Sequence, residues 1–278
     1  ALELDPGDEI LEMQIDELAA SVSAWESLLS IQLTAAQACD NNERKIALWH
    51  KAVQSARDRI GDYEKAEAIC KWILELNDSD ALALADLDRM YLSQGRDADL
   101  LAILKREVEV AEYDDDKIKF LMRAGTLQRD KLDDLEGAIE SFAHVVRIDE
   151  MQLQALTALA DLYDMRNDFE PLFRTLSLLS DMAQTGEERA ALQRRLAIIA
   201  EEKLGRKDDA LALWDEVAAA SPTDAGALQQ LQRLYRDKED WEALIEVCER
   251  EINATAPEVD RIVVLLREIG VVGETKLD

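Results

Sequence analysis

The same residue types return along the chain with a fixed period of 72, and this period runs through three copies without a gap. Three recurring sets show it, each with a step of 72: Tyr91, Tyr163 and Tyr235; Ala66, Ala138 and Ala210; Leu87, Leu159 and Leu231. A fixed period of this kind is typical of a solenoid, in which each unit packs only on its neighbours. We therefore expect one array over residues 1–278, with copies at about 1–40 (partial), 41–112, 113–184, 185–256 and 257–278 (partial), and with both ends as cuts through a longer array.

One copy of the repeat contains four helices. In the middle copy, apolar residues recur at helical spacing over residues 114–132, 135–148, 153–165 and 172–182. Asp133-Asp134 and Asn167-Asp168 separate these stretches, and Pro171 fits the first turn of a helix. Helices joined by such short turns run antiparallel, as two hairpins. No stretch alternates with the period of a strand, so the sequence predicts an all-α fold of about fifteen helices.

Composition supports helix and narrows the range of partners. Hydrophobic residues make up 48% of the chain, while only four prolines and ten glycines interrupt it. The formal net charge is −28, from 32 basic and 60 acidic residues, which disfavours binding to nucleic acid or to an anionic membrane surface. No apolar run approaches the ~20 residues of a membrane helix, so we expect no membrane insertion.

The three cysteines are expected to be buried free thiols. Cys39, Cys70 and Cys248 each occupy a position that other copies fill with an apolar or small residue, such as Ala111, Phe142 or Leu104. Free thiols favour a reducing compartment such as the cytoplasm. Beyond that, the sequence leaves the compartment unknown.

Both hairpins of each copy resemble the tetratricopeptide repeat, a 34-residue helix–turn–helix, and the second carries its first-helix spacing, as in Leu228, Leu231 and Tyr235. The resemblance rests on a turn residue, an alanine five positions later and a large residue four further on, as in Gly61-x4-Ala66-x3-Cys70, Asp133-x4-Ala138-x3-Phe142 and Gly205-x4-Ala210-x3-Trp214. It implies an α-solenoid, a right-handed superhelix of antiparallel hairpins that binds proteins in a concave groove. The chain departs from the family where a small residue is replaced, as by Asp88 and Gln232, and in its period of 72 rather than twice 34.

The sequence shows no motif for catalysis or cofactor binding. Glycine-rich phosphate loops, His-Glu-x-x-His and Cys-x-x-Cys are all missing. The two histidines, His50 and His144, occupy different positions of the repeat, so no metal site is expected from them. Trp25 and Trp241 share a repeat position with Phe169, which favours a core role. We therefore expect no enzyme activity and no cofactor.

One row of basic residues is the candidate binding site. The resemblance implies that the fifth position of each first helix points into the groove, and here that position holds Lys51, Arg123 and Arg195. None has an acid three or four residues away on its own helix. Arg89 and Arg233 add a nearby position, with Asp86 and Asp237 within helical reach.

Two interpretations of the row stay open. Either the five cations pair with carboxylates on adjacent helices, or they form a stripe that binds an acidic peptide or a C-terminal carboxylate. The asparagine of the family's chaperone-binding clamp is replaced by Ser55, Leu127 and Ile199, so that clamp is not expected.

The function predicted from the sequence is a non-catalytic protein–protein interaction scaffold that binds a partner protein or peptide bearing carboxylates. A structural spacer that self-associates is a second interpretation. A regulatory repeat domain attached to an enzyme is a third.

Overall fold

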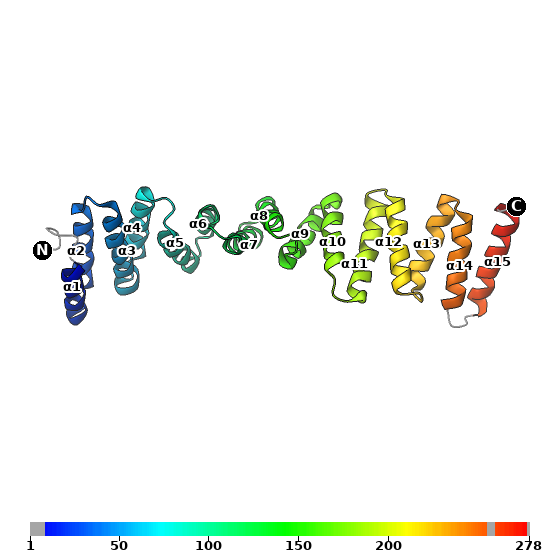
Figure 1. Cartoon of the computed structure of the whole chain (residues 1–278), viewed down its shortest axis with the longest axis horizontal. Helices are drawn as coiled ribbons and strands as arrows, with labels where there is room; N and C mark the ends of the chain where they lie inside the picture. The colour runs from blue at the N-terminus through cyan, green and yellow to red at the C-terminus, as the bar shows by residue number, and fades with distance from the viewer. Residues whose placement is uncertain (1–8, 255–258, 277–278) are drawn as a thin grey trace. The chain divides into compact units, whose positions relative to one another are not determined.

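The computed structural model describes residues 9–254 and 259–276 (Figure 1). Over those residues it contains fifteen α-helices, two short π-helical segments and no strand. The predicted all-α repeat fold is therefore confirmed. Of the two partial copies, the first is described from residue 9 and the last up to residue 276, so residues 1–8, 277 and 278 lie outside the described part.

The chain divides into two compact units, Ala1–Ile148 and Asp149–Asp278. The first unit contains α1 (Glu9–Val22), α2 (Trp25–Ala38), α3 (Asn42–Gln54), η1 (Ser55–Ile60), α4 (Tyr63–Leu76), α5 (Ala81–Gln94), α6 (Asp97–Val110), α7 (Asp114–Asp130) and α8 (Leu135–Ile148). The second contains α9 (Leu153–Arg166), α10 (Phe169–Met182), α11 (Gly186–Ile198), η2 (Ile199–Lys203), α12 (Lys207–Ala220), α13 (Ala225–Lys238), α14 (Trp241–Ala254) and α15 (Val259–Lys276). The single array over residues 1–278 stays a prediction.

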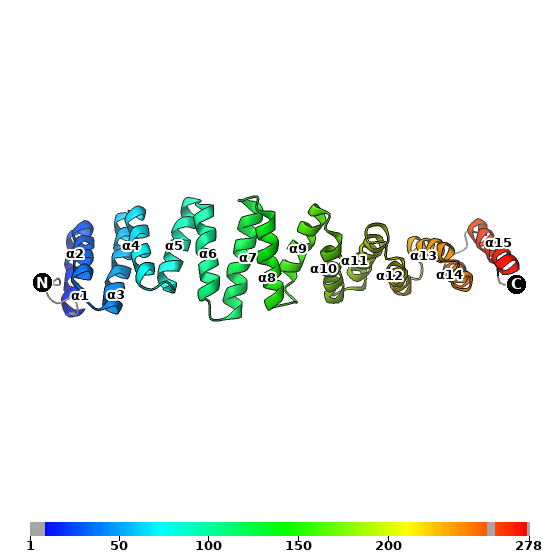
Figure 2. The ribbon, with the colours of Figure 1, turned by 90° about the horizontal axis from the view of Figure 1, so that it is seen from above.

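Within each unit, every helix packs mainly on the helix before it and the helix after it (Figure 2). Ala66, Ala138 and Ala210 are fully buried, and each lets two helix backbones approach closely. Phe142, four residues after Ala138, is 1% exposed and fills the space beside it. The recurring small and large residues thus repeat one helix–helix contact in successive copies.

The turns also repeat with the period of 72. Ser23, Gly95, Asn167 and Glu239 all adopt the left-handed conformation, with φ between 55° and 65°. The residue after each donates its backbone N–H to a carbonyl five residues earlier, as Asp168 does to Tyr163. This closes the preceding helix in the manner of a Schellman motif. Glycine occupies the position only at Gly95, so the fold imposes the conformation on side chains that disfavour it.

The two π-helical segments lie two periods apart, at the same position of the repeat. η1 follows α3 and ends directly before the left-handed Gly61; η2 follows α11 and ends two residues before the left-handed Gly205. In the middle copy α7 continues without such a segment, and Asp133 takes the left-handed position. A π-helical turn widens the helix, so η1 and η2 change how the end of the first helix meets its neighbours.

Cys39, Cys70 and Cys248 are buried free thiols, which confirms the prediction of their burial. Over residues 9–254 and 259–276, no helix combines the length and the hydropathy needed to cross a bilayer. In the same part of the chain, no group of three or more His, Cys, Asp or Glu side chains is arranged to hold a metal ion.

Candidate functional site

The predicted row lies on α3, α7 and α11, and each of its cations contacts a carboxylate of the preceding hairpin. Lys51 Nζ lies 2.5 Å from Glu12 on α1. Arg123 donates two hydrogen bonds to Asp88 on α5, both 2.6 Å long. Arg195 Nη2 lies 3.0 Å from Asp164 on α9. Of the two interpretations left open by the sequence, the structure therefore shows the paired arrangement for these three residues.

The three acidic partners lie on the preceding hairpin, at sequence separations that decrease by four from copy to copy. The separation in sequence between cation and acid is 39 for Lys51 and Glu12, 35 for Arg123 and Asp88, and 31 for Arg195 and Asp164. Each step of four is about one helical turn. The acids therefore occupy successive turns on one face of the facing helix. The sequence contained one sign of the Arg123–Asp88 pair. Asp88 replaces a small residue of the family pattern, and a half-buried carboxylate at such a position needs a cationic partner.

Arg89 and Arg233 lie on α5 and α13. Arg89 Nη1 is 3.8 Å from Asp86 on its own helix, as the sequence predicted, but Arg57 also binds Asp86. Arg233 donates to both oxygens of Glu201 on η2, at 2.7 and 2.6 Å, rather than to Asp237. The side chains of the five predicted cations are between 32% and 67% exposed, so all of them still reach solvent.

The row has a fourth member that the sequence interpretation did not include. Arg267 follows Arg195 by one period of 72 and lies on α15. The three positions that hold acids in earlier copies are here Leu228, Gln232 and Arg236. Arg267 is exposed and forms no ion pair with the described residues. The unbroken step of 72 was a sufficient sequence signal for it.

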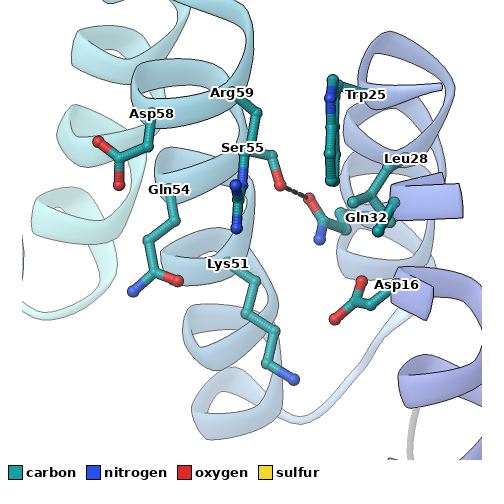
Figure 3. Close-up of a pocket in the computed structure, with 10 residues that line it drawn as sticks. Asp16, Trp25, Leu28, Gln32, Lys51, Gln54, Ser55, Asp58 and Arg59 are labelled. Carbon is teal, nitrogen blue, oxygen red and sulfur yellow. Dashed lines mark hydrogen bonds between the residues drawn. The ribbon is translucent and has the colours of Figure 1, made fainter. Parts of the chain in front are cut away.

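A pocket of about 290 Å³ lies beside Lys51, between α1, α2 and the segment formed by α3 and η1 (Figure 3). Its lining residues are Asp16, Ala20, Trp25, Leu28, Gln32, Lys51, Gln54, Ser55, Asp58 and Arg59. Inside it, the Ser55 hydroxyl donates to Gln32 Oε1 at 2.9 Å, and the Arg59 guanidinium lies 4.9 Å from the centre of the Trp25 ring. Burial raises the pKa of Asp16, while Lys51 opposes that shift.

The cation over Trp25 is one of three such contacts whose rings share one repeat position; Arg59 and Lys203 are two periods apart, whereas Lys276 lies one residue beyond the register. Lys203 lies 5.5 Å from the centre of the Phe169 ring, and Lys276 lies 5.0 Å from that of Trp241. All three rings are half-buried rather than fully buried, so the predicted core role is correct only in part. Such contacts stabilise by about 0.5–1 kcal/mol at exposed sites.

A buried acid lies near the Arg123–Asp88 pair. Glu107 on α6 is 7% exposed, and within the described residues its Oε2 has no hydrogen-bond partner. The pKa of Glu107 is raised to about 7, chiefly by burial and also by Asp88, while Arg123 and Lys119 oppose the rise. The equivalent residue two periods later, Glu251, receives hydrogen bonds from Gln232 and Arg261. One position of the repeat thus holds an uncompensated acid in one unit and a compensated acid in the other.

These features define an α-helical repeat protein with charged and aromatic side chains between its hairpins. Residues 227–261, which begin within α13 and end within α15, match the family model of the tetratricopeptide repeat. The chain therefore contains a tetratricopeptide repeat, and the resemblance predicted from its residues is confirmed. No curated protein matches the chain.

Several solved structures are similar to the chain at low identity. A tetratricopeptide repeat protein from Parabacteroides merdae is 18% identical, with 93% of this chain and 98% of that chain covered and a TM-score of 0.39. YrrB, described as a TPR protein with an unusual peptide-binding site, is 15% identical, with 66% and 90% covered and a TM-score of 0.37. The complex of Naa15 and Naa10 with HypK gives 14% identity, 92% and 39% coverage and a TM-score of 0.48. None of these likenesses transfers a function to this chain.

Proposed function

We propose that the chain is a non-catalytic scaffold that binds a carboxylate-bearing segment of a partner protein through its row of basic residues. The observation that carries the proposal is the recurrence of a partly exposed cation on successive first helices, each oriented by an acid of the preceding hairpin. The fold class supports a protein partner, because helical repeats present extended surfaces.

A paired arginine still has hydrogen-bond capacity for a partner. A guanidinium has five N–H donors, and Asp88 accepts from two of those of Arg123. The Arg123 side chain is 32% exposed, so its outer edge faces solvent. The bidentate contact also fixes the side chain, which lowers the entropy lost when a partner carboxylate binds. Internal pairing and partner binding are therefore compatible at this position.

A charge swap separates binding from stability. In the double variant Arg123→Asp with Asp88→Arg, the ion pair is kept but the cation leaves the row. We expect the swapped protein to unfold at nearly the urea concentration of the wild type, and the single variant Arg123→Asp to unfold earlier. Removing one partner of a partly buried pair leaves an uncompensated charge and costs about 2–3 kcal/mol.

Binding is then measured by fluorescence polarisation with short labelled peptides rich in Asp and Glu. Amide counterparts rich in Asn and Gln serve as the control. The proposal expects the swapped protein to lose affinity for the acidic peptides while its stability is retained. Unchanged affinity in a stable swapped protein would mean that the row serves the fold alone.

Self-association is a second candidate function, favoured by exposed apolar side chains on α1. Ile10, Met13, Leu18 and Val22 are each between 63% and 72% exposed. Exposed apolar side chains gathered on one helix often mark an interface. Sedimentation over a range of concentrations decides this candidate: a dimer that dissociates in the variant Ile10→Glu supports it, and a monomer at all concentrations rejects it.

A further inference from the structure

The second unit contains a pocket of about 460 Å³ between α14, α15 and the end of α13, the last three helices in Figure 1. It combines an apolar wall with a basic rim. The wall includes Trp241, Val264 and Val271, and the rim includes Arg236, Arg267 and Lys276. We name it the Trp241 pocket. Trp241 and Arg267 lie three periods after Trp25 and Lys51, which line the pocket of Figure 3.

The two pockets differ in charge. The first also contains Asp16 and Asp58, which offset Lys51 and Arg59. In the Trp241 pocket one acid lines the wall, Glu268, and Arg236 binds it. Arg267 and Lys276 form no ion pair with the residues that the structure describes. In a chain with a net charge of −28, this pocket therefore keeps two cations that have no carboxylate partner among the described residues.

Arg267 lacks an acidic partner on the facing helix because of the residue types there, and not because of the rotamer of any one side chain. The facing helix offers Leu228, Gln232 and Arg236 at the three turns where earlier copies place an acid. Gln232 already donates to Glu251 at 2.5 Å, and Arg236 already binds Glu268. No change of rotamer on these three residues supplies Arg267 with a carboxylate.

The spacing of the two cations limits what the pocket accepts. Arg267 and Lys276 are nine residues apart on one helix, which is about 13 Å along its axis and about 180° around it. They therefore stand on opposite sides of α15, and Val264 and Val271 lie between them around the helix, nearer to Arg267. One carboxylate does not bridge that separation. In an extended segment, two acids four residues apart with an apolar residue midway place all three side chains on one side and span about 13 Å.

We propose that the Trp241 pocket is a docking subsite for a partner-protein segment in which an apolar side chain is flanked by acidic residues. The apolar side chain packs against the valines beside the Trp241 ring, and the acids bind Arg267 and Lys276, whose Nζ lies 5.0 Å from the centre of that ring. Indole rings and arginines are the side chains most often found at the energetic centre of protein interfaces. This inference rests on the proposed scaffold function and assigns it a partner chemistry.

The test uses labelled peptides with the pattern Glu-Ser-Leu-Ser-Glu, with Gln-Ser-Leu-Ser-Gln and Glu-Ser-Ser-Ser-Glu peptides as controls. The wild-type chain is expected to bind the first peptide and to bind both controls at least tenfold more weakly. Arg267→Glu should weaken binding of the first peptide at least tenfold, with an unchanged urea midpoint because Arg267 makes no ion pair to lose. Trp241→Leu should weaken it as well. Arg147 is an exposed cation of the first unit with no ion pair among the described residues; Arg147→Glu makes the same charge change and should leave binding unchanged.

Each other outcome overturns the inference, and the pattern shows which proposal fails. If Arg267→Glu and Arg147→Glu weaken peptide binding equally, the net charge of the chain alone controls binding. Loss in the Arg123–Asp88 swap with unaltered binding in Arg267→Glu rejects the Trp241 pocket but keeps the row as the binding site. No peptide binding in the wild type rejects both. A concentration-dependent dimer that Arg267→Glu dissociates assigns the pocket to a second copy of the chain.

Discussion

Glu107 gives the most quantitative prediction, because it is a buried acid that the fold leaves uncompensated. Its side chain is 7% exposed, and its pKa is raised from 4.5 to about 7 by burial and by Asp88. The folded chain therefore keeps the Glu107 proton up to about pH 7, whereas the unfolded chain releases it near pH 4.5. The stability that this group contributes is fully present below pH 4.5 and is lost as the pH rises to about 7.

The size of the effect follows from the shift. One pKa unit corresponds to about 1.4 kcal/mol, so a shift from 4.5 to about 7 is worth about 3 kcal/mol above pH 7. Glutamine has nearly the same shape and stays neutral at every pH. We therefore expect Glu107→Gln to raise the free energy of unfolding by about 2–3 kcal/mol at pH 8 and by almost nothing at pH 4.5.

The assay is urea unfolding of the wild type and of Glu107→Gln at several pH values from 4.5 to 8. The difference between the two proteins isolates Glu107, because all other groups titrate in both. Glu251→Gln is the matched control, since Glu251 occupies the same repeat position and is 2% exposed. Arg261 binds both oxygens of Glu251, at 2.7 and 3.0 Å, so this substitution should destabilise the chain at pH 8.

The opposite signs of the two substitutions are the critical result. If Glu107→Gln is no more stable than the wild type at pH 8, Glu107 is not an uncompensated buried acid. A difference that does not change between pH 4.5 and pH 8 would equally refute the reasoning, because it would reflect packing rather than ionisation.

Three further predictions use urea melts or thiol labelling. Glu239→Gly should stabilise the chain by about 0.5–1 kcal/mol, because Glu239 has φ 59°; Asn167→Gly should gain less, since asparagine tolerates that conformation better. Gly125→Ala should destabilise the chain by about 1–3 kcal/mol, because the new Cβ would lie 2.8 Å from the Phe142 ring. This loss should outweigh the better helix propensity of alanine, and a stabilised variant would show that the ring moves. Burial raises the pKa of Cys70 to about 12, so the thiol should react with a disulfide reagent only after urea is added, and rapid native labelling would contradict its burial.

Most of the helical architecture was predictable, because the pattern of apolar residues carries it. The predicted stretch 135–148 is α8 as observed, and 153–165 differs from α9 by one residue. The stretch 114–132 overshoots α7, which ends at Asp130, because apolar Leu132 continues the pattern after the backbone has left the helix. The π-helical segments were not predicted, since an extra residue in one turn leaves no distinct mark in the composition.

The partners of the cations illustrate the limit at the candidate site. Lys51, Arg123 and Arg195 were found from the period and from the missing acids on their own helices. Their actual partners lie one hairpin earlier, at a different helical turn in each copy. A search at fixed spacing therefore does not find them, although the same period would have found Arg267.

By itself, the sequence determined what recurs: the period of 72, the helices, the buried alanines and the positions of the basic row. Each of these features depends on the spacing of residues along the chain, and that spacing can be read directly from the sequence. The tertiary structure alone decided which charges neutralise one another, because an ion pair between hairpins depends on how two helices pack side by side. That packing pairs Lys51 with Glu12, Arg123 with Asp88 and Arg195 with Asp164, although each acid lies at a different sequence separation from its cation.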